Sequence, residues 1–287
     1  MSTMRALHAS HAPSAALQRL GRWAVVSLYD EVALYPKPGL VSFVDSGSHH
    51  DMNGQTFLRS LFALRHYFGD MARLGHRGAA FAALERCGVQ AETAMFRATG
   101  QVNTHRGAIF SLGLLNAAAG AALAATGGIT PATVREHLVK SWGPALTQRT
   151  QRAARLPGAI AAHRYGLRGA SEEAALGFPV LFEVTWPALS AALGQGWDLH
   201  SARLQALLQT IAVMDDCNLA HRGGLAGLQW ARQAAAAFIA DGGMAQPAAH
   251  TRLQQLHQAF VAQRLSPGGA ADMLAAACWL HRAQALA

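Results

Sequence analysis

Apolar residues recur at three- and four-residue spacing along most of the chain, which places them on one face of a helix. The two clearest stripes are Leu17, Leu20, Ala24 and Leu28, then Phe57, Leu61, Leu64 and Phe68. Pro36 and Pro38 end the first helix and force an extended loop. Further helices are predicted over residues 78–99, 105–125, 131–141, 178–193, 200–216, 224–240, 248–263 and 268–285.

The uncharged stretch from Gly107 to Thr126 raises the question of a membrane span. It is mostly alanine and glycine and contains Ser111 and Asn116, so its hydropathy is modest. A central helix buried on all sides is therefore the preferred interpretation, with no membrane. We expect one compact, all-α, multi-helix domain over residues 1–287, with disorder in residues 1–13.

The amino-acid composition favours a helical fold, and the cysteine spacing indicates a reducing compartment. Only 7% of the 287 residues are aromatic, whereas a sheet is enriched in aromatic and β-branched side chains. Cys87, Cys217 and Cys278 are widely spaced, which argues against disulfides and a cysteine-rich zinc site. The start of the chain has no continuous apolar core, so we expect no signal peptide and a cytoplasmic protein.

The formal charge of +8, with 14 histidines beside it, favours a polyanionic partner. The chain has no long run of basic residues interleaved with aromatic side chains, so nucleic acid is not expected. An acidic protein or a small molecule with several phosphates fits better.

Five segments break the helical pattern, and the first runs from Glu31 to Met52. Glu31 falls on the first apolar stripe, where a carboxylate needs a cation, a metal or hydrogen-bond donors; a rim position and a salt bridge are the alternatives. Lys37 either presents a cation to a phosphate or is the solvated lysine of a helix-ending turn. His49, His50 and Asp51 follow, and Asp51 or Asn53 can cap the next helix.

The second and third segments suggest anion binding. Asn103 or Thr104 can cap the buried helix, and His105 and Arg106 beside its start favour an anion site, unless capping alone explains them. Arg168 lies between two glycines, which by itself is only weak support for an anion site.

The fourth segment runs from Met214 to Leu228 and is the most informative. Asp215, Asn218 and Arg222 have the spacing of one helical face, and Asp216 lies beside them. Paired carboxylates favour Mg²⁺, which binds one or two carboxylates together with substrate phosphates. The Arg222-Gly223-Gly224 turn offers a guanidinium and backbone N–H groups to phosphate oxygens, while a solvated helix end is the alternative.

The fifth segment starts the last helix. Ser266 is predicted as its N-cap, with Pro267 at the first helical position. Gly268 and Gly269 then expose the backbone, and Asp272 projects from the next turn.

Taken in order, these segments resemble the triphosphoribosyl-dephospho-CoA synthase family over about residues 23–282. The matching stretches are E-x4-PKPGLVS, GSHHDM, NTHRGAIFSLG, YGLRGASEEA, D-x-N-L-x-x-R-G-G and S-P-G-G-x-A-D. The text around residues 42–68 looks most like the branch serving malonate decarboxylase, rather than the citrate lyase branch. The chain departs from the pattern at Cys217, Ala270 and Ser171, where the family suggests threonine, serine and arginine.

The resemblance implies a transferase that joins ATP to 3′-dephospho-CoA with release of adenine. It implies Glu31 as general base with Asp51 as second choice, and Asp216 and Asp272, with Asp215 less favoured, as Mg²⁺ ligands. The implied phosphate and substrate contacts are Lys37, His50, Asn103, His105, Arg106, Arg168, Asn218, Arg222, Gly223, Gly224, Ser266, Gly268 and Gly269. The product would pass to a transferase acting on an acyl-carrier protein, and a homodimer is compatible.

Three other functions are weighed against this one. A helical Mg²⁺-dependent hydrolase of ADP-ribose linkages would use water as acceptor. A prenyl-transferase-like enzyme would need a second aspartate-rich helix, and the chain has DDxxL without a second copy. A non-catalytic scaffold for an acyl-carrier protein would leave the inward carboxylates unexplained.

Overall fold

The apolar stripes form helices that pack around one another in the computed structural model, which describes the backbone of residues 2–286 and the side chains of residues 14–286. No strand occurs within residues 2–286, so the predicted all-α fold is confirmed. The first six α-helices are α1 (Ser2–Ala33), α2 (Gly54–Leu64), α3 (Tyr67–His76), α4 (Phe81–Thr99), α5 (Arg106–Thr126) and α6 (Pro131–Thr150). They are followed by α7 (Pro157–Tyr165), α8 (Ala170–Ala175), the π-helical η1 (Leu181–Thr185), α9 (Trp186–Gly194), α10 (Leu199–Val213), α11 (Cys217–Ala240), η2 (Gly243–Ala245), α12 (Ala249–Ala262), α13 (Gly268–Ala283) and η3 (Gln284–Leu286).

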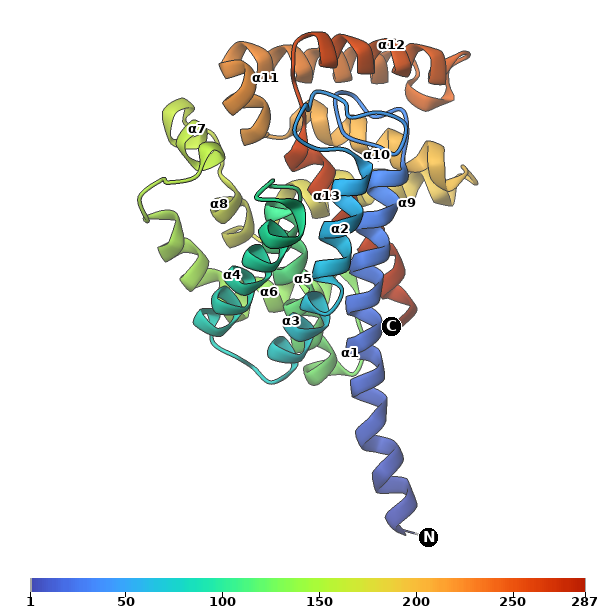
Figure 1. The fold of residues 1–287 in the computed structure, drawn as a ribbon. Coiled ribbons are helices and arrows are strands. Elements are labelled where there is room, and N and C mark those ends of the chain that lie inside the picture. The colour runs from blue at the N-terminus through green and yellow to red at the C-terminus, as the bar shows by residue number, and fades with distance from the viewer. Residues whose placement is uncertain (1, 287) are drawn as a thin grey trace.

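Helix α5 is the central helix that the sequence predicts, with α1, α3, α4, α6 and α13 packed around it (Figure 1). Glycines bring α3 and α5 together: a Cβ atom added at Gly120 would lie 2.0 Å from the Ala72 carbonyl oxygen. Among the described residues, α5 alone is long and apolar enough to cross a membrane, with a mean hydropathy of 1.8. Its most apolar window is 72% buried by protein, as in a core helix.

Several predicted helix boundaries are wrong where packing outweighs local signals. The stripe buries Leu61, Leu64 and Phe68, with Phe57 half-buried, but it belongs to two helices, because the chain turns at Arg65 and His66. Helix α6 continues past the predicted end at residue 141 and contains Pro144, since its later turns bury Leu146 against neighbouring helices. Helix α7 was missed, and the segment predicted over 178–193 starts as a π-helix.

The aspartate-rich segment also differs from its prediction. The helix predicted over 200–216 ends at Val213, and the next begins at Cys217 rather than at residue 224. Asp215 therefore lies outside any helix and does not share a helical face with Asn218 and Arg222. Gly224 has φ 65° and ψ −168°, which kinks α11 and explains why the sequence pattern places the helix start there.

Of the predicted caps, one of two alternatives is confirmed and another cap is wrong. Asn53, not Asp51, caps α2, in a capping box with Thr56. Ser266 does not cap the last helix: Pro267 occupies the N-cap position of α13 without a side-chain bond, because Ser266 faces a histidine instead. The disorder predicted for residues 1–13 concerns side chains outside the described residues and stays a prediction.

One end of the bundle gathers the unusual segments. The loop that follows α1 lies beside α10 and α12, at the upper end of the view in Figure 1. The first turns of α5, α11 and α13 meet at the same end, and their backbone and side chains contact one another. This convergence positions the candidate site.

Candidate active site

A buried ion pair joins the end of α1 to the loop that follows it. Lys37 is 0% exposed, and its ammonium contacts the Glu31 carboxylate and donates to the Glu31 carbonyl oxygen at 2.5 Å. Burial lowers the pKa of Lys37, while the charge of Glu31 opposes this shift. The inward position of Glu31 is thus confirmed through the salt-bridge alternative, and the alternative of a solvated Lys37 is wrong.

Asp272 lies over the first turn of the central helix. Its carboxylate is so close to Gly107 that an added Cβ atom there would lie 1.9 Å from Oδ2. Burial, then the negative charges of Glu31 and Asp216, raise its pKa well above the ordinary value, and the Ala108 N–H partly offsets this. The side chain is half-buried and Gly107 is exposed, so this acidic position opens toward solvent.

Asp216 joins the starts of two helices. It is the N-cap of α11, and its Oδ1 accepts the N–H groups of Asn218 at 2.9 Å and Leu219 at 3.2 Å. Its Oδ2 accepts the Ala270 N–H of α13 at 3.0 Å. Burial raises its pKa, and these backbone donors lower it. The charges of Glu31 and Asp216 both act on Asp272, and we call these three carboxylates the acidic group.

His105 brings a neutral ring to the same place. It is 3% exposed, and its Nδ1 lies 2.7 Å from the Ser60 hydroxyl. Burial, together with the Lys37 charge, lowers the pKa of His105 to about 3. Its Nε2 atom is buried and has no partner among the described residues, so it offers a hydrogen bond rather than a positive charge to a ligand.

Arg222, before the kink of α11, is tied to the protein backbone. Its Nε donates to the Arg264 carbonyl at 2.7 Å, and its Nη2 donates to the Ser48 carbonyl. Arg222 therefore links the loop after α1 with the segment before α13. Two of its donor groups are used in this way, which leaves less of the guanidinium for the predicted phosphate contact.

His49 and Ser266 extend this link. The His49 Nε2 lies 3.0 Å from the Ser266 hydroxyl, and its Nδ1 lies 3.6 Å from the Asp51 carboxylate. Asp51 and His50 are both exposed, in contrast to Glu31. We call Ser48, His49, Arg222 and Ser266 the outer group.

Arg168 and Asp215 lie beside the start of α11 in a separate network. The Arg168 N–H donates to the Asp215 carboxylate at 3.0 Å, and the Arg232 guanidinium contacts the other oxygen at 2.5 Å. The Arg168 side chain pairs with the buried Glu173 at 3.2 Å. These contacts give Asp215 a structural role, apart from the acidic group.

The start of α5 carries the other predicted anion ligands. The N-cap of α5 is His105, without a side-chain cap bond, so the predicted cap at Asn103 or Thr104 is wrong, although Asn103 still accepts the Arg106 N–H at 3.2 Å. The Arg106 side chain pairs with Glu92 at 3.1 Å and lies over Phe96, on the side of α4. The Asn218 amide packs against Gly268, where an added Cβ atom would lie 2.5 Å away.

Two features were missed by sequence reasoning. Gly107 is needed for the close approach of Asp272, and its only sequence signal is a glycine in the first turn of an uncharged helix. Arg149 donates to the Ser171 hydroxyl at 3.2 Å, so a guanidinium lies at the position where the resemblance suggests an arginine.

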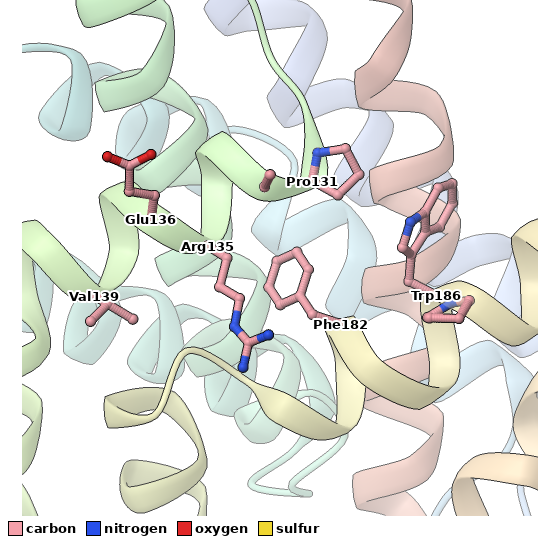
Figure 2. A pocket seen from close by; sticks show the side chains of 8 residues that line it. Pro131, Arg135, Glu136, Val139, Phe182 and Trp186 are labelled. Atoms are coloured by element: carbon pink, nitrogen blue, oxygen red, sulfur yellow. The ribbon is translucent and has the colours of Figure 1, made fainter.

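One surface pocket lies away from these residues. Pro131, Arg135, Val139, Phe182 and Trp186 line a groove between α6 and the η1–α9 segment, shown in Figure 2. It contains none of the predicted site residues and no nucleophile. The chemistry therefore points to the acidic group rather than to this groove.

The donor set suits a metal ion only in combination with a ligand. Within residues 14–286, no three metal-binding side chains gather closely enough to hold an ion by themselves. Mg²⁺ commonly takes one or two carboxylates and completes its shell with phosphate oxygens and water. The half-buried Asp272 fits this pattern, whereas Asp216 already accepts three backbone N–H bonds.

Comparisons with known proteins place the chain in a family. A model of the CitG family, described as ATP:dephospho-CoA triphosphoribosyl transferase, matches residues 17–287. Two similar relatives carry the name "Probable 2-(5''-triphosphoribosyl)-3'-dephosphocoenzyme-A synthase". The relative from Acinetobacter calcoaceticus is 36% identical over 256 residues, covering 89% of this chain and 88% of the relative. The relative from Stutzerimonas stutzeri (strain A1501) is 40% identical over 284 residues, covering 97% and 96%. No solved structure matches the chain.

Proposed function

Because the chain belongs to the ATP:dephospho-CoA triphosphoribosyl transferase family, we propose that it joins ATP to 3′-dephospho-CoA and releases adenine. The product is 2′-(5″-triphosphoribosyl)-3′-dephospho-CoA. The observation that supports this chemistry best is the acidic group beside a buried lysine, at the meeting point of three helix starts. Helix starts favour anionic ligands, and buried carboxylates are suited to proton transfer and to positive charge on a ribose.

The proposed reaction exchanges one bond at a ribose carbon. The 2′-hydroxyl oxygen of dephospho-CoA forms a bond to C1 of the ATP ribose, and the bond from that carbon to adenine breaks. Glu31 accepts the hydroxyl proton, and adenine takes up one proton as it leaves. The contact with Lys37 orients the Glu31 carboxylate, whose negative charge also favours the positive charge that develops on the ribose.

The triphosphate stays on the transferred ribose throughout. We propose that Asp272 would hold Mg²⁺, which would supply positive charge to neutralise the triphosphate. Asp216 and Asp215 as further ligands stay predictions, beside their roles as helix cap and partner of Arg232. His105 Nε2, one of the buried polar atoms without a partner among the described residues, would offer a hydrogen bond to a substrate.

We further propose that the product supplies the prosthetic group of a malonate decarboxylase acyl-carrier protein. The support is the resemblance of residues 42–68 to that branch of the family. A dedicated transferase would attach the group, and both steps would take place in the cytoplasm. Formation of a homodimer is part of the same hypothesis.

Chromatography of the reaction mixture tests the proposed reaction. The protein is incubated with ATP, Mg²⁺ and dephospho-CoA, and adenine and the joined product are expected in equal amounts. Mixtures without dephospho-CoA or with EDTA should yield neither. Rapid release of adenine or ADP without an acceptor would instead identify a hydrolase or an ATPase and would refute the proposal.

A further inference from the structure

A second cavity lies between α3 and α4, and none of its lining residues belongs to the acidic group or the outer group. The two helices pack against each other and are joined by the turn at residues 77–80, at the lower end of the view in Figure 1. The cavity has a volume of about 370 Å³, within the usual range of small-molecule sites, about 300–1,000 Å³. We call it the arginine pocket, and the polar side chains that line it are Asp70, Arg73, Arg77, Arg86, Cys87 and Gln90.

The arginine pocket carries an excess of positive charge. Three arginines and one aspartate line it. Asp70 is the one acid of α3, and its carboxylate contacts the Arg73 guanidinium one turn away on the same helix. Within residues 14–286, Arg77 and Arg86 form neither an ion pair nor a side-chain hydrogen bond. Two guanidinium groups are therefore available to a ligand.

The carboxylates of α4 are turned away from the arginine pocket. Glu85 and Glu92 are the acids of this helix. Glu85 contacts the guanidinium groups of Arg149 and Arg152, and Glu92 pairs with Arg106 at 3.1 Å. Because both glutamates are paired with arginines outside the pocket, neither neutralises the charge within it.

The remaining polar side chains of the pocket come from the middle of α4. Burial, then the Asp70 charge, raises the pKa of the Cys87 thiol, while the Arg73 charge lowers it. The thiol therefore lies among the charges of the pocket and stays protonated at neutral pH. Gln90 follows Arg86 by four residues, so its amide shares a helical face with that guanidinium. No aromatic ring lines the pocket.

We propose that the arginine pocket binds the diphosphate group of a small molecule. Arg77, at the end of α3, and Arg86, on α4, supply one guanidinium for each phosphate, and Gln90 supplies an amide N–H. Guanidinium groups suit this task because their planar N–H donors match phosphate oxygens in pairs. Since the pocket has no aromatic ring, the rest of the ligand contributes little to the affinity.

Protection of Cys87 against N-ethylmaleimide tests the proposal at the pocket itself. The full-length protein is treated with the reagent in Mg²⁺-free buffer at pH 8, with and without inorganic pyrophosphate. Mass spectrometry of the peptide that contains Cys87 gives the rate of modification. Bound diphosphate covers the thiol and places negative charge beside it, which raises the pKa of the thiol further. Saturating pyrophosphate should therefore slow the modification about 5- to 10-fold.

Two further probes identify the part of the ligand that is recognised. ADP should protect Cys87 at about the same concentration as pyrophosphate, because both carry a diphosphate. Adenosine, which has no phosphate, should not protect it. An unchanged rate in millimolar pyrophosphate, or protection by adenosine, would overturn the proposal.

A matched pair of variants locates the binding site. Arg86 and Arg97 are both exposed on α4, but Arg97 does not line the pocket. Arg86→Gln should raise the pyrophosphate concentration for half-protection about 10-fold, because a charge-assisted hydrogen bond is lost. Arg97→Gln should match the parent protein. Equal shifts in both variants would mean general attraction to a basic protein and would refute the site. The measurement needs no turnover, so this proposal and the proposed reaction fail separately.

Discussion

The acidic group and the outer group lie at the same end of the bundle but satisfy their charges in opposite ways. In the acidic group, Asp272 is held near two other carboxylates, and both burial and like charge raise its pKa. In the outer group, the Arg222 guanidinium donates to two backbone carbonyl groups, which accept without adding charge. The repulsion in the acidic group can be relieved by a cationic ligand or by a transition state with positive charge. The outer group instead links two loops. Substitutions should therefore affect turnover in one group and stability in the other.

Asp272→Asn should have the largest effect, because it should lower turnover and at the same time raise stability. We expect turnover to fall about 10²–10³-fold, because one charge-stabilising group is lost, while the folded protein becomes more stable. The pKa of Asp272 is raised on folding, so its ionisation weakens the fold once the pH exceeds the ordinary value. The gain in stability should be present at pH 8 and vanish toward pH 4, where the parent carboxyl is also protonated.

Thermal unfolding in Mg²⁺-free buffer at both pH values measures this effect. A stabilisation of about 1 kcal/mol would raise the melting temperature by roughly 2–4 °C in a protein of this size. Equal melting temperatures at pH 8 would mean that the Asp272 charge is already compensated in the free protein.

Gly107→Ala should disturb the acidic group through shape alone. The added methyl group would meet the Asp272 carboxylate, so the side chain must move away from the first turn of α5. Overpacking of this kind costs about 1–3 kcal/mol, which corresponds to roughly 5- to 150-fold if it falls on the transition state. Steady-state kinetics measures the loss, and Gly194→Ala, in α9, where an added Cβ meets nothing within 4 Å and φ is not positive, controls for the backbone effect of replacing a helical glycine. Normal kcat in Gly107→Ala would show that the exact position of Asp272 is unimportant.

Arg222→Ala should have its main effect on stability. Loss of charge-assisted hydrogen bonds to two loops is expected to lower the free energy of unfolding by about 1.5–3 kcal/mol. Urea denaturation measures this change, and calorimetric titration of ATP measures the accompanying loss of affinity. An unchanged unfolding free energy combined with weaker ATP binding would restore the simple phosphate-ligand role expected from the sequence.

The sequence predicts what depends on local periodicity and misses what depends on distant contacts. The inward position of Glu31 follows from the stripe that begins at Leu17, and the structure confirms it. The start of α11 could not be predicted, because Asp216 caps this helix while it also binds the backbone of α13. The burial of Lys37 was missed for a similar reason, since a loop returns its ammonium to Glu31.

The position of the outer group has the same explanation. Ser266 has the sequence features of a helix cap, but its hydroxyl is within hydrogen-bond distance of a histidine from a distant loop. Arg222 has the features of a phosphate ligand, but backbone carbonyls from two loops lie within its reach. Contacts with residues distant in the sequence cannot be predicted from the local spacing of residues.

Single-turnover release of adenine by the Glu31→Gln variant tests the central claim most directly. The substitution keeps the size of the side chain and removes the charge that pairs with Lys37. If Glu31 is the general base, the rate should fall about 10²–10⁴-fold at every Mg²⁺ concentration while ATP still binds. Partial recovery with excess Mg²⁺ would assign Glu31 to metal binding instead. A near-normal rate throughout would remove Glu31 from the reaction and contradict the account.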